Sequence, residues 1–195
     1  MTYPFLFIER VTKCGYSLED AANLAESTSA LLNVSEFQSI DDATSALVST
    51  MQAFGYAAED SMHVVDVMNE IGNNYAVSSD GIATALQDSA SSLMAANNSY
   101  QEAVALIASA NKVVQDPNSV GSALRTISLR LRGTSTTDLE NAGEETDGAI
   151  TSKSKLRSKI KGLSGIDILT DSGAYKSTYE IKYMSPYKET YMLCI

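Results

Sequence analysis

Tryptophan is absent from this 195-residue chain, aromatic residues make up only 7% of it, and histidine occurs once, as His63. The two cysteines, Cys14 and Cys194, lie near opposite ends of the sequence. Such a pair is weak support for a disulfide and fits a reducing compartment. With one histidine and no paired cysteines, the chain also lacks the ligand spacing of a zinc site. These scarcities argue against both a metal centre and a disulfide framework.

Long hydrophobic runs are missing too, and no stretch approaches the roughly 20 residues that a helix needs to cross a bilayer. The apolar run at residues 4–8 is too short for a signal-peptide core, and no basic residue precedes it. Acidic residues outnumber basic ones by 24 to 14, which gives a net charge of −10. Phosphate binding needs a basic face, so this charge argues against nucleic acid as the main partner. We therefore expect a protein of the cytosol, or of a particle assembled there.

The chain is rich in Ala- and Ser-containing segments of helical length, each with a narrow apolar stripe and a stop signal. In VGSALRTISLRLRG, residues 120–133, the apolar residues recur every three or four positions and share one helical face. Arginines gather toward the end of this segment, where the helix dipole favours positive charge, and Gly133 supplies the stop. About six such helices are predicted between Ser17 and Gly133. They are expected from Ser17 to about Asn33, from Ser39 to Gly55, from Ala57 to about Asn74, from Ser79 to about Asn98, from Ser99 to Asp116, and from Asn118 or Ser119 to Gly133.

The pattern predicts an all-α protein, an array or irregular bundle of about six short-to-medium helices. The Gly, Asn and Pro stops recur too often for one long coiled coil. The segment from Ala57 has the broadest apolar surface and is expected to be the most buried helix. Four regions follow from these patterns: an ill-defined leader at 1–16, the helical core at 17–133, a polar then basic extension at 134–181, and a divergent, poorly packed or disordered tail at 182–195.

Within the extension, residues 134–147 are acidic and predict a short helix or a mobile linker. Residues 153–161 carry five basic side chains with apolar residues at helical spacing. A brief extended segment at 166–169 and a turn at 171–173 are expected next. Ser177 and Glu180 form a capping box, so a helix should begin there. Pro186 then interrupts the helical spacing of Tyr183, Tyr187 and Tyr191.

Two residues of the third predicted helix are candidates for chemistry. His63 could pair with Glu59 one turn earlier or act as a base, although partly buried packing is the more common role of a histidine on an apolar helix. Asp66 stands among apolar residues and could be a switch or an ion site. The simpler interpretation is that it is buried and accepts hydrogen bonds from a neighbouring helix end.

Other segments resemble functional motifs but lack residues that those motifs require. GLSG at 162–165 does not match the nucleophile elbow of serine hydrolases, and no phosphate-binding glycine loop is present. The segment from Asp116 resembles a calcium loop but has Val120 and Ile127 where oxygen ligands are needed. We therefore assign no catalytic, cofactor-binding or metal-binding residue, expect no small-molecule substrate, and predict that the chain is not an enzyme. The basic segment 153–161 leaves open a weak contact with DNA or a membrane.

Several blocks in order resemble the core region of tail tape measure proteins of long-tailed phages and prophages. They are ALVSTMQAFGYAAEDSMHVVDVMNEIGNNYAVSSDGIATALQDSASSL (46–93), VGSALRTISLRLRG (120–133) and KLRSKIKGLSGIDILTDSGAYKSTYEI (155–181). The family's Gly-x-x-Leu-Arg helix is matched by Gly121, Leu124 and Arg125. The resemblance covers about residues 15–181.

The resemblance implies a structural scaffold around which tail-tube subunits polymerise with the help of tail assembly chaperones, and whose length sets the tail length. It implies self-association and a location in the virion tail, with the host cytoplasm as the place of assembly. Full-length members are many times longer than this chain, and the likeness stops at Lys182, so we expect a fragment or a truncated or frame-shifted copy. The alternative is a free-standing acidic helical adaptor that binds a partner helix through the apolar face of the third helix.

Overall fold

Ten α-helices and one short 3-10 helix account for the regular structure of residues 3–184, the part of the chain that this computed structural model describes. No β-strand occurs in that range, and its β-bridge between Leu169 and Tyr175 is isolated. The all-α prediction is confirmed. The helices are α1 (Tyr3–Lys13), α2 (Asp20–Val34), α3 (Ile40–Phe54), η1 (Ala58–Asp60), α4 (Ser61–Asn74), α5 (Ser79–Ala95), α6 (Tyr100–Val114), α7 (Pro117–Leu131), α8 (Thr136–Asn141), α9 (Lys153–Ser164) and α10 (Thr178–Met184).

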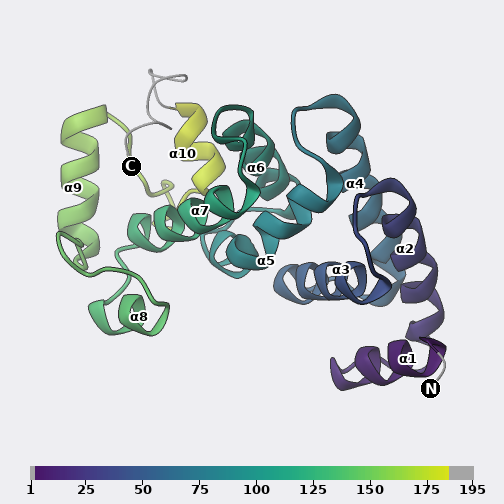
Figure 1. Cartoon of the computed structure of the whole chain (residues 1–195). Coiled ribbons are helices and arrows are strands. Elements are labelled where there is room, and N and C mark those ends of the chain that lie inside the picture. The colour runs from purple at the N-terminus through teal and green to yellow at the C-terminus, as the bar shows by residue number, and fades with distance from the viewer. Residues whose placement is uncertain (1–2, 185–195) are drawn as a thin grey trace.

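The helices form an elongated array rather than a round bundle (Figure 1). Helices α1 and α2 lie at one end, α3 to α7 fill the middle, and α8 and α9 lie at the other end. Helix α10 turns back and packs against α6. Six α-helices, α2 to α7, fall between Ser17 and Gly133, which is the number that the stripes and stops predicted.

Helix α5 is the central element of the array. It packs most extensively against α7 and also contacts α3, α4 and α6. Its buried side is built largely from small residues, with Ile82, Leu86 and Leu93 as the large ones. The prediction that the third helix, α4, is the most buried is wrong: Val64, Val65 and Met68 are buried, but its remaining apolar residues are not. The breadth of the apolar surface was a poor guide, because burial follows how closely the neighbouring helices pack, and the small residues of α5 let α7 approach it closely.

The contact between α5 and α7 depends on one glycine. A Cβ added to Gly121 would lie 2.6 Å from the backbone oxygen of Ala85 and 3.0 Å from its Cα atom. The two helix backbones therefore approach each other more closely than any side chain at position 121 would allow. Val120 and Leu124, on either side of this contact, are buried as their spacing predicted.

Several helix ends are as predicted. Ser39 caps α3, Gly55 ends it in the left-handed conformation, and the capping box of Ser99 with Glu102 begins α6. The box of Ser177 with Glu180 also forms at the start of α10. Because these signals act within one turn of backbone, they are read reliably from the sequence.

Other ends need correction by one to three residues. Helix α5 is capped by Ser78 rather than Ser79, and α7 begins at Pro117 with Asp116 as its cap. Proline suits the first helical position because its missing N–H would have no partner there. Ser17 and Asp20 do exchange hydrogen bonds, but they close the turn before α2, which starts at Asp20.

The expected leader at 1–16 is not ill-defined over Tyr3–Lys13, which forms α1. Phe7 and Val11, one helical turn apart, are buried in the main core, and Arg10 lies 3.7 Å from a carboxylate oxygen of Asp41. With only Phe7 and Val11 contributed to the core, this segment has too short an apolar stripe for a helix to be recognised in the sequence. At the other end, Lys182 lies within α10, is half-buried and is hydrogen-bonded to Ser109, so at this residue the predicted tail is packed. Met184, the last residue of α10, is 55% exposed. The rest of the tail prediction concerns the Tyr183 side chain and residues 185–195, which lie outside the described part of the chain.

The part of the chain after Gly133 adds a second, smaller set of buried residues. The main core is formed by α1 to α7. Four apolar side chains after Gly133 are buried outside that core: Leu139, Leu156, Ile166 and Ile168. Residues 134–184 therefore bring some core of their own to the array.

Candidate functional site

The two residues singled out for chemistry both lie on the exposed side of α4. His63 is within hydrogen-bond distance of Gln101 (Nε2 to Nε2, 3.0 Å) and meets the edge of the Tyr56 ring, so its contacts are neither the expected Glu59 nor a core pocket. Asp66 forms no hydrogen bond or ion pair among residues 3–184, and the prediction that it is buried is wrong. At 100° per residue, Asp66 points about 150° away from the buried side of α4.

The described residues hold no group of three or more His, Cys, Asp or Glu side chains arranged to bind a metal. In the same range, no helix combines the length and the apolar character that a membrane span requires. Cys14 is half-buried after α1, and Cys194 lies outside the described residues. Among the described residues, four contact surfaces are candidate sites.

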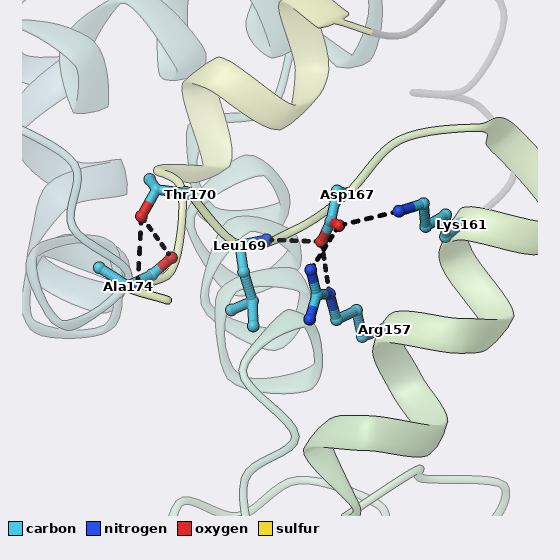
Figure 2. A network of polar contacts seen from close by, with 6 residues as sticks. All are labelled: Arg157, Lys161, Asp167, Leu169, Thr170 and Ala174. Carbon is cyan, nitrogen blue, oxygen red and sulfur yellow. Dashed lines mark hydrogen bonds and ion pairs between the residues drawn. The ribbon is translucent and has the colours of Figure 1, made fainter. Parts of the chain in front are cut away.

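The first is the basic helix α9, whose cations are mostly engaged within the chain. Figure 2 shows the guanidinium of Arg157 on the carboxylate of Asp167, with both nitrogen–oxygen distances below 2.8 Å, and Lys161 3.2 Å from the same carboxylate. Asp167 also accepts the backbone N–H of Leu169 at 3.1 Å. The hydrogen bond from Arg157 and then that from Leu169 hold the pKa of Asp167 well below its ordinary value. We call these residues the Asp167 clip.

The clip leads into a turn that places Tyr175. Thr170 accepts the backbone N–H of Ala174 through its hydroxyl, and Gly173 takes a φ of +83°. Lys153 of α9 lies over the ring of Tyr175, 5.5 Å from its centroid. Three of the five basic residues of α9 are thus used inside the chain, and the predicted basic surface is reduced to Lys155 and Lys159.

The second surface, which we call the seam, joins residues 175–184 to the main array. Asn97 donates to the backbone oxygen of Tyr175 at 2.8 Å, and Asn98 accepts the backbone N–H of Tyr179 at 3.0 Å. The Tyr175 hydroxyl donates to the backbone oxygen of Arg132 at 2.9 Å. Asn97 and Asn98 were predicted only as a helix end, and Asn97 does take a positive φ. Their side-chain partners, about 80 residues away, gave no signal in the sequence.

The third surface lies on α7. Arg125 donates from Nε to Glu144 at 2.9 Å, and the Thr126 hydroxyl donates to the other carboxylate oxygen of Glu144 at 2.6 Å. Arg130 donates to the backbone oxygen of Glu145 at 3.0 Å. The acidic segment after Gly133, predicted as a short helix or a mobile linker, contains α8 and folds back on this side of α7.

The fourth surface is an open apolar hollow of about 450 Å³ between α1, α2 and the start of α3. Phe7, Ile8, Leu18 and Ile40 line it together with alanines of α2. Leu18 is 71% exposed. In the part of the chain that the structure describes, the buried side of α4 is covered by neighbouring helices, so it does not present the uncovered face that an adaptor would need.

Comparison with known proteins gives the family. Residues 7–180 match the family of phage-related minor tail proteins, a range that begins in α1 and ends in α10. No solved structure matches the chain. The match includes residues 7–16 of the segment that was expected to be a leader, in keeping with the packing of Phe7 and Val11. The chain therefore belongs to the family of phage-related minor tail proteins and has a structural role in the phage tail.

Proposed function

We propose that this chain is a core segment of a tail tape measure protein, a scaffold on which the tail tube assembles and which sets the tail length. The order of the matching blocks carries the proposal. Block 46–93 contains α4 and most of α3 and α5, block 120–133 contains most of α7, and block 155–181 contains most of α9 and the start of α10. The blocks thus include the central contact of α5 with α7, the Asp167 clip and one side of the seam.

The proposed partners are other tail proteins: tail-tube subunits, tail assembly chaperones and further copies of this chain. Assembly would take place in the host cytoplasm, and the product would lie in the virion tail. A tight DNA or membrane contact is not part of the proposal. Lys155 and Lys159 are the two basic side chains of α9 without a contact among residues 3–184, and the chain has a net charge of −10. The role is structural and needs no enzymatic activity.

The test is the length of the tails made by phage that carry an altered gene. A straight α-helix rises 1.5 Å per residue, so removing residues 61–95 (α4 and α5) in frame should shorten the tail by about 50 Å if the measuring form is extended helix. Duplicating the same residues should lengthen it by about the same amount. Electron microscopy of assembled particles measures both.

Two results would contradict the proposal. Particles with normal tails after both changes would place the chain among minor tail proteins that do not set length. A gene neighbourhood without tail-tube and tail chaperone genes upstream would argue against a tape measure gene. Substituting Asp66, which is exposed and uninvolved in packing, provides a control that should leave tail length unchanged.

A further inference from the structure

Residues 134–151, which we call the strap, leave the array and return to it at one point. A Cβ added to Gly133 would lie 3.5 Å from the backbone oxygens of both Ile150 and Thr151, so the two ends of the strap meet. Gly133 takes a φ of +60°, which favours glycine, and it turns the chain out of α7 into the strap. The strap is thus a closed loop on the side of α7 rather than a link between distant parts.

One carboxylate of the strap is nearly enclosed. The Glu144 side chain is only 7% exposed, and it binds both Arg125 and Thr126 of α7. The other acidic side chains of the strap, those of Asp138, Glu140, Glu145 and Asp147, belong to exposed residues. Glu144 is therefore the charged group by which the strap holds α7, with Leu139 as its buried apolar anchor.

The strap satisfies the arginines of α7 incompletely. Arg130 donates a hydrogen bond to the backbone oxygen of Glu145 rather than to a carboxylate. Its Nε is buried and has no hydrogen-bond partner in residues 3–184. A guanidinium matches a carboxylate with two parallel hydrogen bonds, and a buried donor without an acceptor is unfavourable. The surface of α7 thus has two arginines and a hydroxyl as hydrogen-bond donors, and one strap carboxylate, that of Glu144, accepts from it.

We propose that this surface of α7, formed by Arg125, Thr126 and Arg130, is a binding site for an acidic segment of another protein, and that the strap occupies it in the free chain. A peptide with two neighbouring carboxylates would give Arg125 its present partner and Arg130 the partner it lacks. A nucleic acid fits less well, because its phosphates repeat along the whole strand, and two arginines neutralise few of them on a chain of net charge −10. The site goes beyond the proposed tail scaffold, and its test needs no phage particles.

The test uses Glu144→Gln, which keeps the shape of the side chain and removes its charge. The matched control is Glu140→Gln, an exposed residue of the same strap whose side chain makes no hydrogen bond among the described residues. The probe is a labelled peptide with the strap's own sequence, residues 135–147, and the readout is fluorescence anisotropy. We expect the E144Q chain to bind the peptide at least tenfold more tightly than the E140Q chain, a ratio equal to about 1.4 kcal/mol.

The bound peptide must use the arginines. Adding Arg125→Gln to E144Q should abolish the gain in affinity, and equal binding by E144Q and E140Q would overturn the proposal. Binding that is indifferent to the Arg125 change would overturn it as well, since the peptide would then lie elsewhere.

A second measurement uses the unaltered chain and does not depend on how the variants fold. Excess peptide should raise the hydrogen exchange of strap amides near Glu144 by displacing them, while exchange in α5 stays the same. Peptide binding without a change in strap exchange would show that the strap and the peptide do not compete, and would refute the proposed site.

Discussion

Tyr100 is the largest fully buried side chain of the main core and carries a polar group into it. Its hydroxyl donates to the backbone oxygen of Val64 at 2.6 Å, across from α6 to α4. The rings of Phe54 and Tyr56 meet it edge to face, with centroids 5.6 and 5.9 Å away. The hydroxyl therefore has a specific acceptor, and burial and the neighbouring Tyr56 raise its pKa well above 10.0.

Replacing Tyr100 with phenylalanine should destabilise the protein. The change keeps the ring and leaves the Val64 carbonyl without its buried donor, which costs about 1–2 kcal/mol. Urea denaturation followed by circular dichroism measures it. A Tyr75→Phe variant is the control, because Tyr75 is 61% exposed and its loss should change the free energy of unfolding by less than about 0.5 kcal/mol.

Tyr100 should also make stability fall at alkaline pH. The folded state keeps Tyr100 neutral because its pKa is raised, whereas the unfolded chain releases this proton above about pH 10. Its contribution is thus complete below pH 10 and is lost as pH rises toward the folded pKa. Above about pH 10, the unfolding free energy of the wild type should drop more steeply than that of Y100F. Parallel curves would contradict the assignment.

Replacing Gly121 with alanine should lower the stability of the protein, and replacing Gly162 with alanine should raise it. At Gly121 the new methyl group meets the Ala85 backbone, and such overpacking costs about 1–3 kcal/mol. At Gly162, exposed in α9, no atom lies within 4 Å, and alanine should stabilise the helix by about 0.5–1 kcal/mol. Thermal melting of the two variants gives the signs. Stabilisation by G121A would mean that α5 and α7 can separate freely.

At the scale of the element, α9 depends on its neighbours more than on its own apolar face. Leu156 is its one buried residue, and Leu163 is 78% exposed. The Asp167 clip attaches it through Arg157 and Lys161, and Lys153 lies over the ring of Tyr175. A helix held in this way should loosen without disturbing the array.

The substitution Asp167→Asn should raise hydrogen exchange in α9 while α3 to α7 stay protected. Lowering the pH should do the same in the wild type. The clip's contribution is present above the ordinary aspartate pKa of 3.8 and is lost as pH falls below it, because the folded pKa is lowered. Asp171→Asn, on the exposed turn that follows, is the control. Unchanged α9 exchange in D167N would show that Leu156 and the Lys153 contact hold the helix without the clip.

The sequence predicted those elements that are defined within a single turn of chain. Helix-end signals can be recognised by their spacing because the hydrogen bonds they make are local. Examples are Ser99 with Glu102, Ser177 with Glu180, and Gly55. The site surfaces were largely missed for the opposite reason. The hydrogen bonds of Asn98 with Tyr179 and of Arg125 with Glu144 form only when segments distant in the sequence pack together. The spacing of residues along the sequence does not predict such pairs. Gly121 was recognised as part of a motif, but its contact with Ala85 was not.

For the molecule as a whole, attachment differs between the two parts. Helices α1 to α7 share one apolar core. The contacts of residues 134–184 with these helices include the polar ones of the seam, of Glu144 and Glu145 and of Lys182, together with the buried Leu139 and the partly buried Tyr179. Polar contacts of this kind resemble those between domains that move relative to each other. The C-terminal part should therefore open more easily than the core.

Native-state hydrogen exchange in low denaturant tests this difference. Amides of residues 153–184 should exchange through openings of lower free energy than those of α5, whose slowest amides should report global unfolding. Asn98→Ala, which removes the acceptor of the Tyr179 N–H, should widen the gap. One common opening energy for both parts would show that the molecule unfolds as a single unit.

The meeting of the strap's two ends beside Gly133 bears on how this protein could change over generations. Where a loop departs and returns at one point, residues can be gained or lost in it without altering the distance that the rest of the chain must span. Lengthening such a loop also destabilises the fold only slightly, since each doubling of the loop length adds about 0.6 kcal/mol of loop-closure entropy. Relatives could therefore carry strap segments of very different size, even whole inserted domains, on an otherwise constant array of helices.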